Sequence, residues 1–514
     1  MEFEISFMGP QKGFGMVAKK DFQPGDLILE EAPAFFFQEL ENKGTTITCC
    51  NCGKFMGSLD HQLLLACGEI TRLDVPAAPS ACSCGEAYCC DECREHARES
   101  AHRLLCVAAA RATETDPLML FKEHAIENNE IFLLAGEVLS RFVGQVARGE
   151  WAPLPPRGAS QPAAAASSVT DTAAAATPSS PSPRSEVEAL LPPDLRTMVR
   201  GEWPEVAAPS CNPRNGKVRA ILREQLEESW GYLRQALGAP HPELPPPAQE
   251  YLRRVLAEGA LYSELIGLFE LNTIDINMAS PLQALLCRMA QQGPESPLAP
   301  LGERLFGEHR EALQNLVRMH AIQEQEQEDA SDADEDGEEE DEEDEEEEGE
   351  DEDEDDEEHC GCGHHHAGHA KGRKIPKPRT FADFLGYVAH AFPSPATSDP
   401  LASLEPSQNP LFEPLRGRAL FPRIARINHS CVPNAAVFYP IGGDEPLRAR
   451  LVAVRPIVAG EEICISYIDE DLPRPKRQAA LREGYRFVCV CPKCLAEATP
   501  ARSEGAKKKK AHPK

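Results

Sequence analysis

The two ends of the chain alternate apolar and polar positions with the two-residue period of β-strands. Four runs with this pattern are predicted strands: residues 3–7, 27–30, 448–454 and 462–468. Turn sequences around Gly13 and Gly25 separate the first runs, and Pro456 and Gly460 separate the last two. Neither end has enough strands to be stable alone. We therefore expect the strands of the two ends to pair with each other.

Between these ends, the apolar positions follow the 3.6-residue period of helices. Residues 107–151 and 186–322 have helical composition. In the second region, four apolar residues are spaced for one helix face: Leu222, Leu226, Trp230 and Leu233. Three other segments have little to bury, namely an Ala/Ser/Pro/Thr linker at 152–185, an acidic and His/Cys-rich tract at 323–377 and a basic tail at 499–514. We expect the acidic tract to be a disordered spacer.

The composition describes a globular chain with one strongly acidic segment. Its 514 residues suggest two or three domains. The net charge is −32, but residues 328–358 contain 26 Asp and Glu and no Lys or Arg, so −6 remains for the rest. No apolar run reaches the roughly 20 residues of a membrane span, and the acidic start lacks the pattern of a signal peptide. We expect neither a membrane protein nor a secreted one, and no direct recognition of nucleic acid.

The chain has nineteen cysteines, and most of them are clustered. Ten lie between Cys49 and Cys106, and three lie between Cys489 and Cys494. Because the cytosol and nucleus keep thiols reduced, such clusters predict zinc rather than disulfides. Two ligands a few residues apart can hold the same tetrahedral zinc ion. The first cluster offers eight candidates, enough for two closed sites: Cys49, Cys52, Cys82, Cys84, Cys89, Cys93, His102 and Cys106.

The order of these ligands resembles the MYND zinc finger, which interleaves its ligand pairs. The resemblance assigns one set of thiols to the first zinc ion: Cys49, Cys52, Cys89 and Cys93. It assigns the other set to the second ion: Cys82, Cys84, His102 and Cys106. The family usually has two residues between the cysteines of the second pair, whereas only Ser83 separates them here. Cys67 or Cys90 could therefore replace one of these ligands.

Three motifs in the last hundred residues are more specific than any other part of the sequence. They are Asn428-His429-Ser430-Cys431, the run from Gly460 to Tyr467, and the run from Tyr485 to Cys494. Together with Lys12-Gly13-Phe14-Gly15, they resemble the SET domain of lysine methyltransferases, which use S-adenosylmethionine. A SET domain interrupted by a MYND finger is the layout of the SET-and-MYND protein-lysine methyltransferases. Within that family, the ending is most similar to the fifth member.

The resemblance implies an α+β fold. A β-rich SET domain would be split by a MYND zinc finger and a helical insertion, and would end in a zinc-bound post-SET segment. The expected parts are the N-terminal SET piece at 1–48, the finger at 49–106, a helical segment at 107–151, the helical insertion at 186–322, the C-terminal SET piece at 378–470 and the post-SET segment at 471–498.

The resemblance also implies roles for individual residues. Those against the cofactor would be Lys12, Gly13, Phe14, Gly15, Asn272, Asn428, His429, Tyr467 and Phe487. Tyr467 and Tyr485 would be catalytic, the first beside the transferring methyl group and the second lining the lysine channel. Methyl transfer to lysine is a direct displacement by a neutral amine, so catalysis is mostly positioning and local electrostatics. Because a phenol with a pKa of about 10 is a weak base, Tyr467 is interpreted as an orienting group.

A third zinc site is expected at the C-terminal cysteines. Cys489, Cys491 and Cys494 supply three ligands. The resemblance to the family implies that Cys431 supplies the fourth. Since metal binding is coupled to folding, this ion would hold the post-SET segment beside Asn428.

We therefore expect an enzyme that methylates a lysine of a histone tail or of a non-histone protein such as a ribosomal protein. Two alternatives remain open. One is a binding scaffold, in which the finger recruits proline-rich partners and the SET core is inactive. The other is a histone chaperone that acts through the acidic tract. The enzyme is preferred because the expected cofactor residues are all present. A monomer in the cytoplasm and nucleus is expected.

Overall fold

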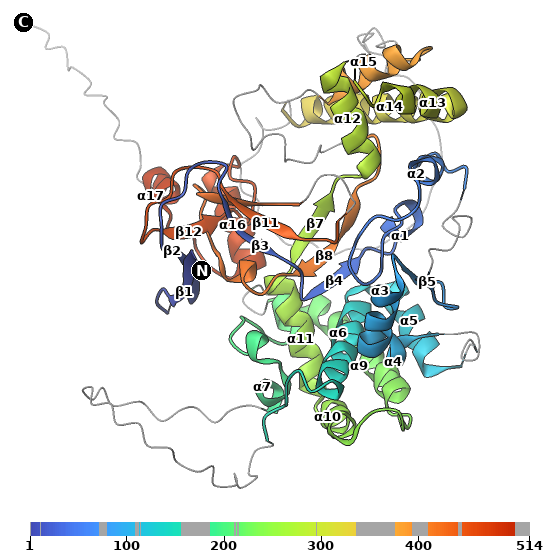
Figure 1. The fold of residues 1–514 in the computed structure, drawn as a ribbon. Coiled ribbons are helices and arrows are strands. Elements are labelled where there is room, and N and C mark those ends of the chain that lie inside the picture. Colours follow the sequence, from blue (N-terminus) through green and yellow to red (C-terminus); the bar gives the residue numbers. More distant parts are fainter. Residues whose placement is uncertain are drawn as a thin grey trace, which may run out of the picture.

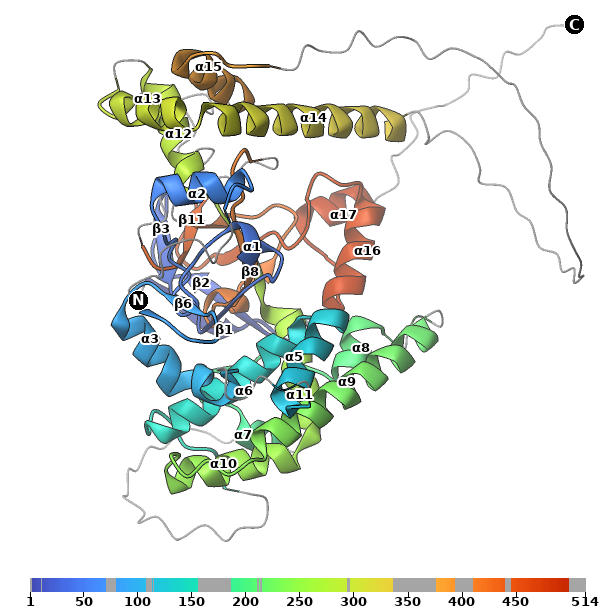
Figure 2. The same ribbon diagram turned by 90° about the vertical axis from the view of Figure 1, so that its right-hand side faces the viewer.

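The computed structural model describes residues 2–10, 12–70, 80–107, 113, 115–155, 186–209, 212, 215–293, 296–335, 376–392, 410–439 and 445–498. Most of the predicted linker, the His/Cys-rich tract and the basic tail lie outside these residues. Figures 1 and 2 show three layers, with small β-sheets between an upper and a lower group of helices.

The middle layer contains three sheets, and strands from distant parts of the chain meet in each. Their strand orders are β1-β2-β12-β9, β10-β11-β3 and β4-β8-β7. Met16 lies opposite Ile463 in the first sheet, and Leu29 lies opposite Leu451 in the second. The predicted pairing of the two ends is therefore confirmed. The strands are β1 (Phe3–Phe7), β2 (Phe14–Ala18), β3 (Leu27–Glu31), β4 (Phe35–Gln38), β7 (Ile274–Met278), β8 (Leu415–Leu420), β9 (Asn428–His429), β10 (Ala435–Phe438), β11 (Ala449–Ala453) and β12 (Glu462–Ile465).

One parallel pair within these sheets positions the C-terminal motifs. Strands β9 and β12 run in the same direction, with Cys464 opposite Asn428 and Ile465 opposite His429. Buried apolar residues, including Ile463 on β12 and Met16 on the neighbouring β2, hold this pair against the core of the sheets. The Asn-His pair therefore lies beside the strand that leads directly into Tyr467.

The cysteine-rich segment packs against the upper helices through α2 (Leu59–Ala66) and against the lower helices through its last turns. It also contains the hairpin β5 (Ser80–Ala81) and β6 (Ala87–Tyr88), α3 (Asp91–Ala97) and α4 (Arg103–Leu105), after the short α1 (Asn42–Thr45). Tyr88 is only 2% exposed and lies at the centre of this segment. A Cβ atom at Gly144 would lie 2.6 Å from the main-chain oxygen of Glu99. Glycine therefore allows this close approach.

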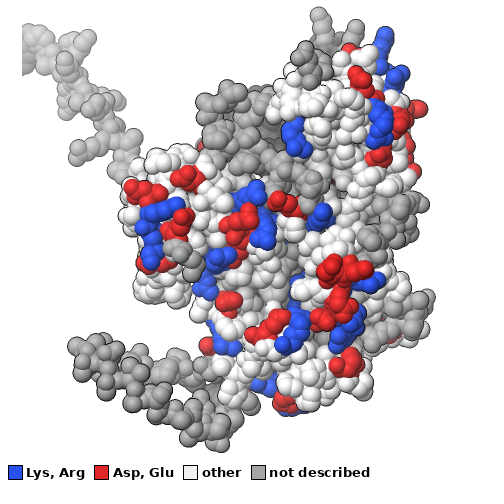
Figure 3. Space-filling view, viewed as in Figure 1, with Lys and Arg blue, Asp and Glu red and all other residues white. Residues whose placement is uncertain are grey.

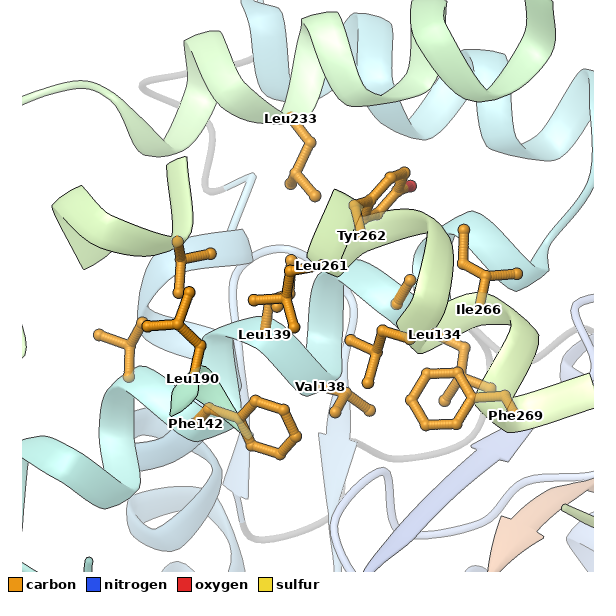
Figure 4. Packing of buried hydrophobic residues seen from close by; sticks show 14 of the residues in the cluster. Leu134, Val138, Leu139, Phe142, Leu190, Leu233, Leu261, Tyr262, Ile266 and Phe269 are labelled. Carbon is orange, nitrogen blue, oxygen red and sulfur yellow. The ribbon is translucent and has the colours of Figure 1, made fainter. Parts of the chain in front are cut away.

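The lower layer is a helical core. Figure 4 shows Leu134, Val138 and Phe142 packed near Leu261 and Phe269. The predicted apolar face of residues 222–233 packs into the same core. Its helices are α5 (Pro117–Asn128), α6 (Ile131–Ala147), α7 (Glu186–Leu190), α8 (Trp203–Ala207), α9 (Gly216–Leu237), α10 (Pro246–Ala257) and α11 (Gly259–Asn272).

The region predicted to be helical from 186 to 322 also contains a strand. β7 follows α11 and pairs antiparallel with β8, so that Ile276 lies opposite Gly417. Its residues, Ile-Asp-Ile-Asn-Met, alternate with a period of two, but the run is short and lies between strong helical patterns. A Cβ atom at Gly417 would lie 2.2 Å from the main-chain oxygen of Phe37 on β4. The glycine therefore permits β8 to lie between its two neighbours.

The upper layer differs from the predicted boundaries in two ways. It consists of α12 (Pro281–Gln292), α13 (Ala299–Glu308), α14 (Arg310–Glu335) and α15 (Phe381–Ala391). Helix α14 continues to Glu335, so disorder from residue 323 is wrong for this stretch, which is rich in the helix formers Ala, Glu and Gln. Helix α15 packs on α13 through Phe384 and Phe306, whose rings are 5.7 Å apart, rather than joining the C-terminal sheets. None of the described helices is long and apolar enough to cross a membrane.

Candidate active site and metal centres

The turn between β1 and β2 brings Gly15, one of the predicted cofactor residues, against Asn428. Gly13 has φ +65°, a conformation that glycine adopts without strain. A Cβ atom at Gly15 would lie 2.7 Å from Nδ2 of Asn428, so any larger residue would collide with it. The turn and Asn428 are therefore in direct contact, although they are far apart in the sequence.

Glu462 on β12 connects these two parts. Its Oε2 accepts a hydrogen bond from Nζ of Lys12 at 2.5 Å, and its Oε1 accepts one from Nδ2 of Asn428 at 2.8 Å. The Glu462 side chain is 15% exposed and that of Lys12 is 48% exposed. The hydrogen bond from Glu462 raises the pKa of Lys12, which therefore stays charged. The sequence prediction omitted Glu462; the available signal was its place inside the Gly460–Tyr467 motif.

Four aromatic side chains meet on the other side of Asn428. The rings of Tyr467 and Tyr485 have centroids 4.8 Å apart, and the ring of His429 lies 5.4 Å from that of Tyr467. Phe487 completes the group at 5.9 Å from His429. The hydroxyl of Tyr485 donates to the main-chain oxygen of Tyr467 at 3.3 Å. The structure thus gathers both predicted catalytic residues and two further predicted cofactor residues. His429 is on β9, Tyr467 follows β12, Tyr485 ends the helix α16 (Arg474–Tyr485) and Phe487 follows that helix.

His429 is held in one tautomer. Its Nδ1 accepts a hydrogen bond from the main-chain N–H of Tyr467 at 3.0 Å, so the proton of the neutral ring is on Nε2. Nε2 lies 3.3 Å from Sγ of Cys431. Burial lowers the pKa of His429 to about 4, and the nearby Arg477 adds to this effect. A neutral imidazole therefore connects the aromatic group to the cysteine.

Both tyrosines remain protonated at physiological pH. Burial raises the pKa of Tyr467 well above its usual value, and the neighbouring Tyr485 adds to this. Burial also raises the pKa of Tyr485. The hydroxyl of Tyr467 donates a hydrogen bond to the main-chain oxygen of Ile427. This geometry fits a group that orients its neighbours rather than one that accepts a proton.

Phe14 and Asn272, which were predicted to contact the cofactor, do not belong to the aromatic group. Phe14 is 41% exposed; its ring lies 5.7 Å from that of Phe7, and Arg426 covers it. Asn272 is buried at the end of α11, where Nδ2 donates to the main-chain oxygens of Val199 and Leu268. Asn272 therefore anchors the helix end to the preceding loop, and none of its hydrogen bonds within the described residues reaches the aromatic group.

The cysteine-rich segment forms two compact groups with the predicted membership. Zn–S bonds of about 2.3 Å place two sulfurs of a tetrahedral site about 3.8 Å apart. The sulfurs of Cys52 and Cys89 are 3.7 Å apart, and those of Cys82 and Cys106 are 3.6 Å apart. The groups are Cys49, Cys52, Cys89 and Cys93, and then Cys82, Cys84, His102 and Cys106. Cys67 and Cys90 belong to neither, so the close spacing of Cys82 and Cys84 is accommodated.

The third group joins the C-terminal segment to the Asn-His motif. Its members are Cys431, Cys489, Cys491 and Cys494. The sulfur of Cys431 lies 3.6 Å from that of Cys494 and 4.0 Å from that of Cys489. Four thiols around one centre, with two of them already at the spacing of a tetrahedral zinc site, form a donor set that fits zinc. The ligands lie around α16 and α17 (Pro492–Ala498), so this group holds both helices near His429.

Comparison with known proteins assigns part of the C-terminal half of the chain. Residues 322–468 match the family model described as the SET domain. The match includes the Asn-His motif and Tyr467. The sheets with their flanking helices form an α+β fold, as expected, and the three cysteine-rich groups could bind zinc.

Three curated relatives match over short segments. Human protein-lysine N-trimethyltransferase SMYD5 is 47% identical over 85 residues, which are 16% of this chain and 20% of the relative. Histone-lysine N-methyltransferase ATXR2 of Arabidopsis thaliana is 45% identical over 84 residues, 16% and 17% of the two chains. Human N-lysine methyltransferase SMYD2 is 41% identical over 81 residues, 16% and 18%. The aligned part thus spans about a fifth of the length of these relatives. We conclude that this chain carries a SET domain similar to those of the SET-and-MYND protein-lysine methyltransferases.

Proposed function

We propose that this chain is a protein-lysine N-methyltransferase that uses S-adenosylmethionine. The observation that carries the proposal is the convergence of the glycine turn, Asn428, His429 and the tyrosine pair at one place in a SET domain. The names of the similar proteins support the same reaction. An inactive scaffold is not favoured, because these residues are both present and assembled.

In this reaction the residues of the chain would bind the cofactor, orient the lysine side chain and shield the reacting groups. Gly13 and Gly15 let the main chain approach the cofactor closely. When bound, S-adenosylmethionine supplies an electrophilic methyl group. The Tyr467 hydroxyl and the ring of Tyr485 would form the wall beside a lysine side chain, and the hydroxyl would orient its nitrogen. The protein's contribution is thus positioning in a partly buried site.

We further propose that the three cysteine-rich groups each hold one zinc ion. The expected ligand sets support this, because they are of the Cys₄ and Cys₃His types found in structural zinc sites. All four positions of each site are filled by the protein, which suits a structural role. The ions would be part of the folded state.

We also propose the class of substrate and the location. The substrate would be a histone tail or a non-histone protein such as a ribosomal protein, and the MYND finger could recruit proline-rich partners. We propose a monomer that acts in the cytoplasm and nucleus. On the face shown in Figure 3, the described acidic and basic side chains are interspersed, without a broad field of one sign. This surface suits selection of a substrate by local contacts near the site.

Cofactor binding is the first test. Calorimetry on the zinc-loaded full chain should show S-adenosylmethionine binding that is lost in a double variant, Asn428→Ala with His429→Ala. Circular dichroism would establish that the variant remains folded. Transfer of a labelled methyl group to histones and ribosomal proteins would then identify substrates. A folded, zinc-loaded wild-type chain that does not bind the cofactor would refute the proposed function.

The pH dependence should follow the substrate amine. The free lysine amine has a pKa of about 10.4, so its neutral fraction rises about tenfold per pH unit below that value. Because the pKa of Tyr467 is raised, its hydroxyl stays protonated over this range. We expect kcat/KM for a lysine peptide to rise about tenfold per unit between pH 7 and 9. A profile that falls within this interval would show that a protonated group with a lower pKa is needed.

Replacing Glu462 should weaken cofactor binding. Glu462→Ala removes the acceptor that holds both Lys12 and Asn428. A hydrogen bond to a charged group contributes about 1.5–3 kcal/mol, so the dissociation constant should rise about tenfold or more. Glu461→Gln is a matched control, because Glu461 accepts from Asn434 and Arg455 instead. Calorimetry that finds equal affinities for Glu462→Ala and wild type would exclude the positioning role.

A further inference from the structure

An arginine is buried beside the third cysteine group. Arg477, on α16, is 1% exposed, as deeply buried as the apolar core. A charged group that is removed from water is costly unless it has a compensating partner. The sequence places Arg477 among polar residues of the post-SET helix and gives no reason to expect its burial. Its partners must therefore explain its position.

The guanidinium group reaches one of the ligand sulfurs. Its Nη2 donates to Sγ of Cys494 at 3.7 Å and to Oε2 of Glu497 at 2.7 Å. Its Nη1 donates to the main-chain oxygen of Leu472. Nε is buried and has no hydrogen-bond partner among the described residues. The guanidinium group of arginine keeps its proton in proteins, even when it is buried. The buried side chain therefore stays a cation.

A zinc ion with four thiolates carries a net charge of about −2, which the surrounding protein must balance. Arg477 is a cation that donates to one of these sulfurs, that of Cys494. The finger provides a contrast, because Cys93 there accepts a hydrogen bond from the neutral amide of Asn51 at 3.4 Å. The neighbouring Gln478 fixes the main chain of Cys489 from both sides, with hydrogen bonds of 2.9 and 3.1 Å. Two consecutive residues of α16 thus act on the site: Arg477 provides a positive charge, and Gln478 fixes the main chain of Cys489.

We propose that Arg477 retains zinc in the post-SET site by donating to the thiolate of Cys494, whose sulfur lies 3.6 Å from that of Cys431. The inference rests on the proposed zinc site and adds a residue to it that is not a ligand. Hydrogen bonds to metal-bound groups commonly change metal affinity by about 10- to 100-fold. Because α16 ends at Tyr485, retention of this ion also keeps that tyrosine beside Tyr467. Arg477 is thus a positioning residue that acts through the metal.

Site-resolved alkylation tests the proposal without measuring methyl transfer. The zinc-loaded full chain is exposed to a chelator and a thiol-alkylating reagent, and mass spectrometry follows each cysteine. In Arg477→Gln, we expect the four post-SET cysteines to be modified about 10- to 100-fold faster than in wild type. The eight ligands of the finger should react at unchanged rates and serve as an internal reference. Arg477→Lys keeps the positive charge but loses the planar set of N–H donors of the guanidinium group. Its post-SET cysteines should therefore be modified at a rate between those of wild type and Arg477→Gln.

Arg474→Gln is the matched control. Arg474 is on the same helix and donates to the main-chain oxygen of Cys494 at 3.0 Å rather than to its sulfur, so its loss should leave the alkylation rates nearly unchanged. Unchanged rates in both Arg477 variants would overturn the proposal. If thermal melting shows that Arg477→Gln is not folded, Arg477→Lys takes its place in the test. Faster modification of the post-SET cysteines than in wild type would then support the proposal, and an unchanged rate would overturn it. A wild-type chain without zinc at these cysteines would overturn both this inference and the third zinc site.

Discussion

Replacing Tyr467 by phenylalanine is expected to reduce methyl transfer by about 100- to 1,000-fold, the usual cost of losing one preorganised donor at a reacting centre. The variant keeps the ring that packs against Tyr485 and His429 and loses only the hydroxyl. That hydroxyl now donates to the main-chain oxygen of Ile427. The cofactor should therefore bind with nearly unchanged affinity while kcat falls. Single-turnover transfer of a labelled methyl group, with calorimetry of cofactor binding, measures the two effects separately.

Tyr439→Phe is a matched control for this experiment. Its hydroxyl also donates to a main-chain oxygen, that of Asp275 at 3.0 Å, but it lies outside the aromatic group. Both variants lose a comparable hydrogen bond, which costs about 1 kcal/mol of stability. If Tyr467→Phe and Tyr439→Phe retain the same rate, the hydroxyl of Tyr467 has no part in catalysis.

The local parts of the site could be predicted from the sequence. Zinc ligands follow each other at short spacing, so the pattern of cysteines indicated the candidate ligands, and the family resemblance divided them into groups and added Cys431. Cys82 and Cys84 show the limit of this reasoning, because only the structure shows them grouped with His102 and Cys106, and without Cys67 or Cys90. The pairing of the two β-rich ends was also predictable, since neither could bury its strands alone.

Interactions between distant residues could not be predicted. Lys12 and Glu462 are separated by 450 positions, and no local pattern connects them. Arg477 has the same appearance in the sequence as an exposed helical arginine. Helix α15 has an apolar face that packs against the upper helices, but an apolar face in the sequence does not say which element it will contact. Asn272 was placed by resemblance alone, and its hydrogen bonds give it a structural role.

Removal of Cys431 should abolish cofactor binding through loss of the third zinc ion. Its sulfur lies 3.3 Å from Nε2 of His429, whose Nδ1 holds the main chain of Tyr467. A structural zinc ion contributes about 10 kcal/mol or more to folding of its own segment. In Cys431→Ser, we therefore expect the post-SET helices to detach and the affinity for S-adenosylmethionine to fall about 100-fold or more. Zinc content by emission spectroscopy and calorimetry on the same sample measure both changes.

Two further variants separate this effect from general loss of cysteine or zinc. Cys287→Ser removes a thiol of the upper layer that belongs to none of the three groups, so it should keep all the zinc. Cys49→Ser removes a ligand of the finger and should lose zinc there, while the contact between His429 and Cys431 remains. The expected order of cofactor affinity is wild type and Cys287→Ser first, then Cys49→Ser, with Cys431→Ser far below. Equal losses in Cys49→Ser and Cys431→Ser would show that zinc stabilises the whole chain rather than the cofactor site in particular. Full affinity in a Cys431→Ser chain that lacks the third ion would show that His429 and Tyr467 are positioned without it.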